Sequence, residues 1–193
     1  RDVIRIQIGE CYLALGDHAM ALQHFEAAHA SALEIGDPLT IFSSRYYLRS
    51  LKAGVSLGTP DVLAVLREVS TLMPNLLLVC RSAHYFGSGQ GMRGQADDGL
   101  QVMLAAHRML LERDEHEAVF ELAYQSAVFL SLPLPAVSQR LLSLIRIHAE
   151  AYPQLQTMAA ELARERGLTL DEPPAQAEPL SAALIRAFQP PQR

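Results

Sequence analysis

The residues from Gly89 to Gly94 have the G-x-G-x-x-G spacing that binds a dinucleotide in some folds. That chemistry requires the first glycine to end a strand, so that backbone amides at a helix N-terminus meet the pyrophosphate. Glu112 lies about twenty residues further on, where an acidic residue would bind the ribose. However, Arg81–Ser88 separate the glycines from the apolar segment Leu76–Cys80, and no further strand is indicated. A nucleotide-binding enzyme domain is therefore the alternative hypothesis.

Other side chains that could do chemistry do not have partners at the spacing that a site requires. His18, His24 and His29 are separated by offsets of six and five residues, which do not place them on one helical face. Glu112 and His116 are one turn apart, but two ligands without a third are more typical of a solvated helix pair. No Gly-x-Ser-x-Gly run or comparable signature organises a nucleophile and a base. We therefore predict no catalysis, no metal ion and no cofactor.

Charged and polar side chains at helical spacing suggest a binding surface instead. Three basic residues lie at i, i+4 and i+7 in the segment 45–52, and three polar ones at i, i+3 and i+7 in the segment 81–88. In a chain of net negative charge, such a local basic cluster can bind an acidic peptide or carboxylate terminus, with Leu48 and Tyr85 adding apolar contact area. For each residue alone, an ordinary solvated helix face is the alternative. The predicted partner-binding groove consists of Glu10, Arg45, Arg49, Lys52, Arg81, His84 and Ser88.

The composition excludes several classes of protein. The chain has 193 residues, of which 50% are apolar and 19% are charged, and this is typical of a soluble globular protein. The net charge of −5 argues against direct binding of nucleic acid. No apolar run approaches the ~20 residues of a membrane helix. Cys11 and Cys80 are far apart and form no disulfide framework, so we expect a cytoplasmic protein.

Two features concern the source of the chain. Lys52 is the only lysine among many arginines, which indicates a GC-rich and hence a bacterial genome. Residue 1 is an arginine, so we expect the chain to be part of a longer protein.

The elements that must position these side chains are helices, because apolar residues recur with a period near 3.6 throughout the chain. Gly16, Gly58 and Gly94 mark turns about 40 residues apart, which indicates a helical solenoid. Thr59 is the expected N-cap of the helix that starts at Pro60, and His107 falls on an apolar stripe and should be a hydrogen-bonded interior residue. The expected helices are about 2–15, His18–Ile35, Leu39–Val55, Pro60–Met73, Asn75–Gln90, Ala96–Leu111, Glu115–Leu130, Pro135–Ala151 and Pro153–Arg166.

The first hairpin resembles a tetratricopeptide repeat. That family places small residues where paired helices approach, aromatic residues between helices, and a glycine at the turn. The corresponding residues here are Gly9, Tyr12, Gly16, Ala21, Phe25 and Ala28. A third hairpin with Gly87, Gly94 and Gly99 fits less well, and Arg5 stands where the family has a large aromatic residue. The resemblance is close over about 35 residues and extends loosely to about residue 150.

This resemblance implies an all-α fold, an α-solenoid of antiparallel helix hairpins that forms a tetratricopeptide-like superhelix over residues 1–168. The long second helix that ends at Ile35 resembles the variant in bacterial LuxR-type, maltose-regulator-like and peptide-sensing regulators. It implies a non-catalytic scaffold that binds a protein or peptide, as a sensor or regulatory arm in transcription regulation. A dimerisation module is a further alternative, in which the chain forms a homodimer.

Residues 169–193 differ in composition from the rest. A Pro-rich linker spans Asp171–Pro179, and a short amphipathic helix follows with Leu180, Leu184, Ile185 and Phe188 on its apolar face. Because so short a helix is marginal in water, something must cover that face. We predict that it docks against the end of the array, next to the helix Pro153–Arg166, and buries Phe188. Docking onto a neighbouring chain is the alternative.

Overall fold

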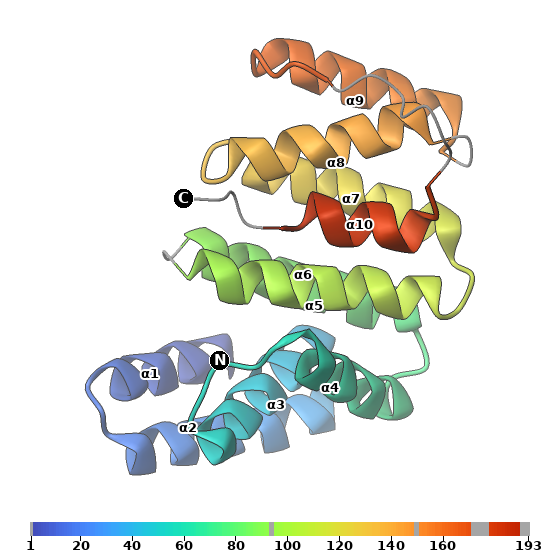
Figure 1. The fold of residues 1–193 in the computed structure, drawn as a ribbon. Coiled ribbons are helices and arrows are strands. Elements are labelled where there is room, and N and C mark those ends of the chain that lie inside the picture. Colours follow the sequence, from blue (N-terminus) through green and yellow to red (C-terminus); the bar gives the residue numbers. More distant parts are fainter. Residues whose placement is uncertain (1, 93–94, 149–150, 171–177, 190–193) are drawn as a thin grey trace.

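The computed structural model describes residues 2–92, 95–148, 151–170 and 178–189, and these residues form helices and no strand. The helices pack side by side as antiparallel hairpins (Figure 1), which confirms the predicted α-solenoid. None of the described helices is long and apolar enough to cross a membrane. The helices are α1 (Asp2–Ala14), α2 (His18–Ile35), α3 (Pro38–Ala53), α4 (Thr59–Leu72), α5 (Leu76–Met92), α6 (Ala96–Leu111), α7 (His116–Leu130), α8 (Pro135–Ile147), α9 (Pro153–Glu165) and α10 (Leu180–Ala187).

The turns are made largely as the sequence predicts. Gly36 ends α2 in the left-handed conformation, with φ at 69°, and Asp37 accepts a hydrogen bond from the Leu39 amide at the start of α3. The expected N-cap of α4 was wrong: Gly58 is the capping residue and Thr59 lies inside the helix. The Thr59 hydroxyl instead donates to Gln101 of α6. Gly94, the third predicted turn glycine, lies outside the described residues.

The first hairpin depends on a close approach between α1 and α2. A Cβ atom at Gly9 would lie 2.5 Å from Cε1 of Phe25, so any other residue at this position would require the buried Phe25 ring to shift. Phe25 and Ala21 are fully buried, and the Phe25 ring stacks on Tyr47 of α3 with the centroids 4.6 Å apart. Tyr12 stacks on His24 within the hairpin. These residues therefore have the packing roles that the repeat resemblance implied.

The two sides of the array are built differently. The first helices of successive hairpins form a continuous row, in which α1 packs on α3, α3 on α5, α5 on α7 and α7 on α9. On the other side α4 packs on α6, but α6 and α8 have no contact of their own within the described part of the chain. The C-terminal helix α10 lies between them and contacts both (Figure 1).

The C-terminal helix forms as predicted and buries Phe188, but its predicted docking place was wrong. It packs in the gap between α6 and α8 instead of on α9 at the end of the array. The Phe188 ring lies against His107 of α6, with centroids 4.9 Å apart. Arg140 of α8 donates from Nε to the Ala187 carbonyl at 3.1 Å, and so satisfies an unpaired carbonyl at the end of α10. Residues 171–177 of the predicted linker lie outside the described residues.

The register of the first hairpin makes a testable prediction. Ala21→Leu would add volume where no side-chain space remains, and it should lower the free energy of unfolding by roughly 1–3 kcal/mol. Ala27→Leu is the matched control, because Ala27 is an exposed residue of the same helix. Chemical denaturation of both variants measures the difference. Equal stability of the two variants would contradict the assigned register.

The position of α10 makes a second prediction. Phe188→Ala removes the largest buried side chain of the helix, so hydrogen exchange should become faster in α6 and α8, which α10 covers. Ile185→Ala is the control, because Ile185 lies on the exposed side of α10. Faster exchange confined to α9, with α6 and α8 unchanged, would contradict this docking place.

Candidate functional site

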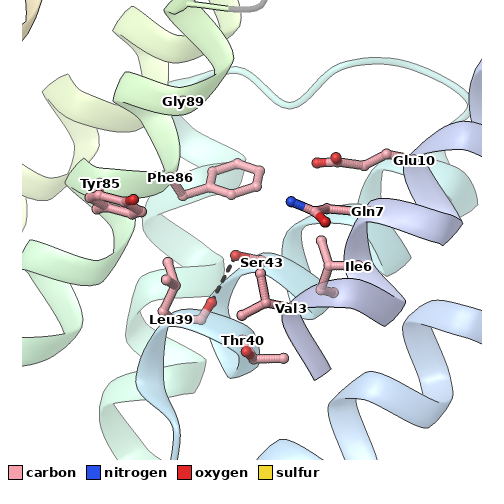
Figure 2. Close-up of a pocket in the computed structure, with 10 residues that line it drawn as sticks. All are labelled: Val3, Ile6, Gln7, Glu10, Leu39, Thr40, Ser43, Tyr85, Phe86 and Gly89. Carbon is pink, nitrogen blue, oxygen red and sulfur yellow. Dashed lines mark hydrogen bonds between the residues drawn. The ribbon is translucent and has the colours of Figure 1, made fainter. Parts of the chain in front are cut away.

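A cavity opens on the face of the array formed by α1, α3 and α5. Its volume is about 490 Å³, including space open to solvent. Figure 2 shows α1 and α5 facing each other across α3, with Val3 and Ile6 on one wall and Tyr85 and Phe86 on the other. Val3 is 49% exposed and Tyr85 is 61% exposed, whereas Ile6 and Phe86 are buried. Each wall of the cavity thus has one exposed apolar side chain next to a buried one.

Two residues in the floor of this cavity, Thr40 and Ser43, have hydroxyl groups that already donate their protons in hydrogen bonds. The Ser43 hydroxyl donates to the Leu39 carbonyl at 2.7 Å (Figure 2), and the Thr40 hydroxyl donates to Asp37. Both bonds stay within α3 and its cap. These two hydroxyls therefore have no proton left to donate to a ligand, but their oxygens can still accept a hydrogen bond.

Glu10, at the edge of this cavity, belongs to a hydrogen-bonded chain of three side chains from three hairpins. The Tyr47 hydroxyl of α3 donates to Glu10 of α1, and Nε2 of Gln90 in α5 donates to the Tyr47 oxygen at 2.5 Å. Glu10 lines the apolar cavity and also a second cavity, of about 660 Å³, beside Tyr47 and Gln90. Gln90 is only 2% exposed, and its Oε1 atom has no hydrogen-bond partner among the described residues.

Aromatic packing holds this chain in place. Tyr47 stacks on Phe25 and meets Phe86 edge to face, with the centroids of Tyr47 and Phe86 5.5 Å apart. Tyr46 lies edge-on to Tyr47, and burial raises the pKa of Tyr46 to about 12, so its phenol stays neutral. These ring contacts therefore hold the acceptor groups beside the cavity in fixed positions.

The predicted basic cluster does not gather at this cavity. Of the seven predicted groove residues, Glu10 lines both cavities, and the other six line neither. Arg49 reaches Glu68 of α4 at 3.0 Å, and Arg81 reaches Glu121 of α7 at 2.9 Å. Lys52 is exposed and Arg45 is half-buried. Two of the predicted cations thus neutralise acidic residues of neighbouring helices.

His84 and Ser88, which were expected on the surface, are buried, and this part of the predicted site was wrong. His84 is 2% exposed, and its Nε2 lies 2.8 Å from the Ser126 hydroxyl. That hydroxyl donates to the Leu122 carbonyl, so His84 is the donor in the first bond. The Ser88 hydroxyl donates back to the His84 carbonyl. The reason is that α5 packs against α3, α4, α6 and α7 and is covered on more than one face.

His107 has the interior position that the sequence predicts. It is fully buried, and Nδ1 lies 2.7 Å from the Met103 carbonyl, so this nitrogen carries the proton. Burial lowers the pKa of His107 to about 4, although the bond to Met103 favours the charged form. Burial, together with the nearby His107, lowers the pKa of His84 to about 3. Both rings are therefore neutral at pH 7.

The glycine run does not form the turn that a dinucleotide site requires. Gly89, Gln90, Gly91 and Met92 belong to α5, so their backbone lies in a helix and follows no strand in the described part of the chain. Gly94 lies outside the described residues. Glu112, the expected ribose ligand, pairs with Arg67 at 2.8 Å. Among the residues described, no group of three or more potential metal ligands occurs.

Comparisons with known proteins do not add to this description. No protein-family model matches the chain, and neither a curated protein nor a solved structure matches it.

The burial of two neutral histidines predicts how the unfolding free energy of the protein depends on pH. In the unfolded chain each takes up a proton near pH 6.5, whereas in the folded protein each stays neutral until the pH falls to about 4 for His107 and about 3 for His84. As the pH is lowered from 6.5 to 5, the unfolding free energy should therefore decrease, by roughly 1.4 kcal/mol per pH unit for each fully titrating histidine.

Urea denaturation at several pH values tests this dependence. The variant His107→Gln should show a shallower fall than the parent protein, and His18→Gln should match the parent, because His18 is exposed. A parent protein whose stability is constant from pH 6.5 to 5 would contradict the burial of neutral histidines.

Proposed function

We propose that the chain is a non-catalytic helical-repeat scaffold that binds a peptide or a protein segment, in the cavity between α1, α3 and α5. The observation that carries the proposal is the exposed apolar surface of this cavity, with Val3 of α1 on one wall and Tyr85 of α5 on the other (Figure 2). Large aromatic side chains at the rim of a pocket are frequent energetic hot spots of interfaces. A partner that places one apolar side chain between these walls would cover them.

The proposed setting is the regulatory or sensor arm of a larger bacterial protein, such as a cytoplasmic transcriptional regulator. This part rests on the resemblance of the first hairpin to the long-helix repeat variant, which the packing of Gly9 and Phe25 supports. In such an arm, a bound segment that contacts α1, α3 and α5 together would alter how three hairpins stack. Because each hairpin of a solenoid packs on its neighbours, that change could be passed along the array.

A second candidate function is self-association through exposed apolar side chains of the first hairpin. Ile4, Leu15 and Ile35 are 59%, 79% and 67% exposed. A helical repeat normally buries apolar side chains against a neighbouring repeat. Light scattering over a range of concentrations tests it, and Leu15→Glu should reduce any dimer that forms.

A panel of dye-labelled hexapeptides, each with a central Leu or Phe flanked by varied residues, tests the peptide-binding function. Tyr85→Ala should weaken binding about ten-fold, since an interface hot spot contributes roughly 1–2 kcal/mol or more. Its melting temperature should stay the same, because Tyr85 is exposed. Leu132→Ala is the control, because Leu132 is also a large exposed hydrophobic residue but lies in the turn after α7. Equal binding by both variants would contradict this location, and no binding by the parent protein would contradict the function.

A further inference from the structure

The C-terminal helix α10 follows α9 in the sequence but does not pack on it. Among the described helices α10 contacts α6 and α8 only, and it fills the gap between them (Figure 1). We call the surface of α6 and α8 that α10 covers the α10 site. We propose that the α10 site is a docking surface for an amphipathic helix of another protein, which binds there in place of α10. None of the residues that line the cavity between α1, α3 and α5 belongs to α6, α8 or α10, so this docking function is additional to the proposed one.

The buried face of α10 shows which side chains the site accepts. Its buried residues recur at i, i+3, i+4, i+7 and i+8, and they are Leu180, Ala183, Leu184, Ala187 and Phe188. This spacing is the apolar pattern of a helix that binds in a groove. The two alanines let the helix lie close to the surface that it covers, and Phe188 is the largest side chain of the set.

The hydrogen bonds between α8 and the end of α10 do not involve the side chains of α10. Arg140 donates from Nε to the Ala187 carbonyl at 3.1 Å, and it also donates to the Gln189 carbonyl. The last carbonyls of every helix lack a partner within that helix. A different helix would therefore offer the same acceptors to Arg140, and the site selects its ligand by the spacing of apolar side chains.

The array holds α6 and α8 in place without α10. The helix α6 packs on α4, α5 and α7, and the helix α8 packs on α7 and α9. The helix α10 has eight residues, and so short a helix is marginal in water. It can therefore leave the site while the hairpins stay packed. An empty site would expose the His107 ring that Phe188 now covers, together with apolar surface, so a helix that refills the site gains free energy.

A helix of another protein has an advantage over the α10 of a second copy. A second copy would only repeat the contacts that the chain already makes within itself, where the effective concentration of α10 is on the order of millimolar. A partner segment that is helical before it binds loses less conformational entropy than α10 does. The expected partner is thus a preformed helix with large apolar residues at the positions of Leu180, Leu184 and Phe188, and small residues at the positions of Ala183 and Ala187.

Fluorescence anisotropy with a labelled peptide of residues 178–189 tests this docking function on the full chain. A lactam that joins Ser181→Lys to Ile185→Glu keeps the peptide helical, because both positions are exposed and lie one turn apart. The receiving protein is the Leu184→Glu variant, in which a charge on a fully buried side chain releases α10 from the site. We expect this variant to bind the peptide about ten-fold or more tightly than the parent protein, in which α10 competes.

Two matched controls locate the binding. Ile185→Glu places the same charge on the next residue, which is exposed, so this variant should bind the peptide as weakly as the parent. A peptide with Phe188→Ala lacks the aromatic ring and should bind the Leu184→Glu protein about ten-fold more weakly. The bound peptide should slow hydrogen exchange in α6 and α8. A folded Leu184→Glu variant that does not bind the peptide, or binds it no better than Ile185→Glu does, would overturn the proposal.

The parent protein decides the matter even if Leu184→Glu does not fold. At peptide concentrations above the effective concentration of α10, which is on the order of millimolar, hydrogen exchange in α10 should become faster while α6 and α8 stay protected. Unchanged exchange in α10 under these conditions would contradict the exchange of helices. Light scattering tests the second copy as the occupant. A dimer of the parent protein that Phe188→Ala abolishes would show that the α10 of another copy binds the site, and it would rule out the partner helix.

Discussion

The stacked contact of Phe25 with Tyr47 links the first hairpin to the rest of the molecule. Gly9 allows α1 to approach the Phe25 ring, and that ring in turn supports Tyr47 of the next hairpin. Tyr47 then connects Glu10 of α1 to Gln90 of α5 through its hydroxyl group. One aromatic contact therefore holds the acceptors of three hairpins at the edge of one cavity. If α1 were displaced, the wall formed by Val3 and the position of Glu10 would be lost together.

The C-terminal half is organised by a contact between elements that are not neighbours in sequence. A solenoid normally gains its stability from adjacent repeats alone. Here α6 and α8 are joined through α10, whose Phe188 closes over the neutral His107 and whose C-terminal carbonyl is bound by Arg140. The helices that line the cavity and the helices that α10 covers are connected by the contact between α5 and α6. The helix α5, which forms one wall of the cavity, also carries the buried His84, and burial lowers the pKa of both His84 and His107.

Local patterns were sufficient to predict the helices but not the partners of polar side chains. Gly36-Asp37-Pro38 defines a helix end and start by its own backbone chemistry, and the apolar stripe around His107 indicates burial, so both were predictable. By contrast, Arg81 pairs with Glu121, and Thr59 bonds to Gln101, across about 40 residues of sequence. Helical periodicity does not report contacts at that separation. For the same reason His84 could not be distinguished from an exposed residue, and the gap that receives α10 could not be foreseen.

In the proposed binding mode a ligand enters between α1 and α5, above α3. Hydrogen–deuterium exchange of the full chain, with and without the hexapeptides that have a central Leu, tests this most directly. We expect slower exchange in α1 around Val3 and Ile6 and in α5 around Tyr85, with no change in α8 or α9. Slower exchange confined to α8 and α9, or unchanged exchange throughout the chain at saturating peptide, would contradict it.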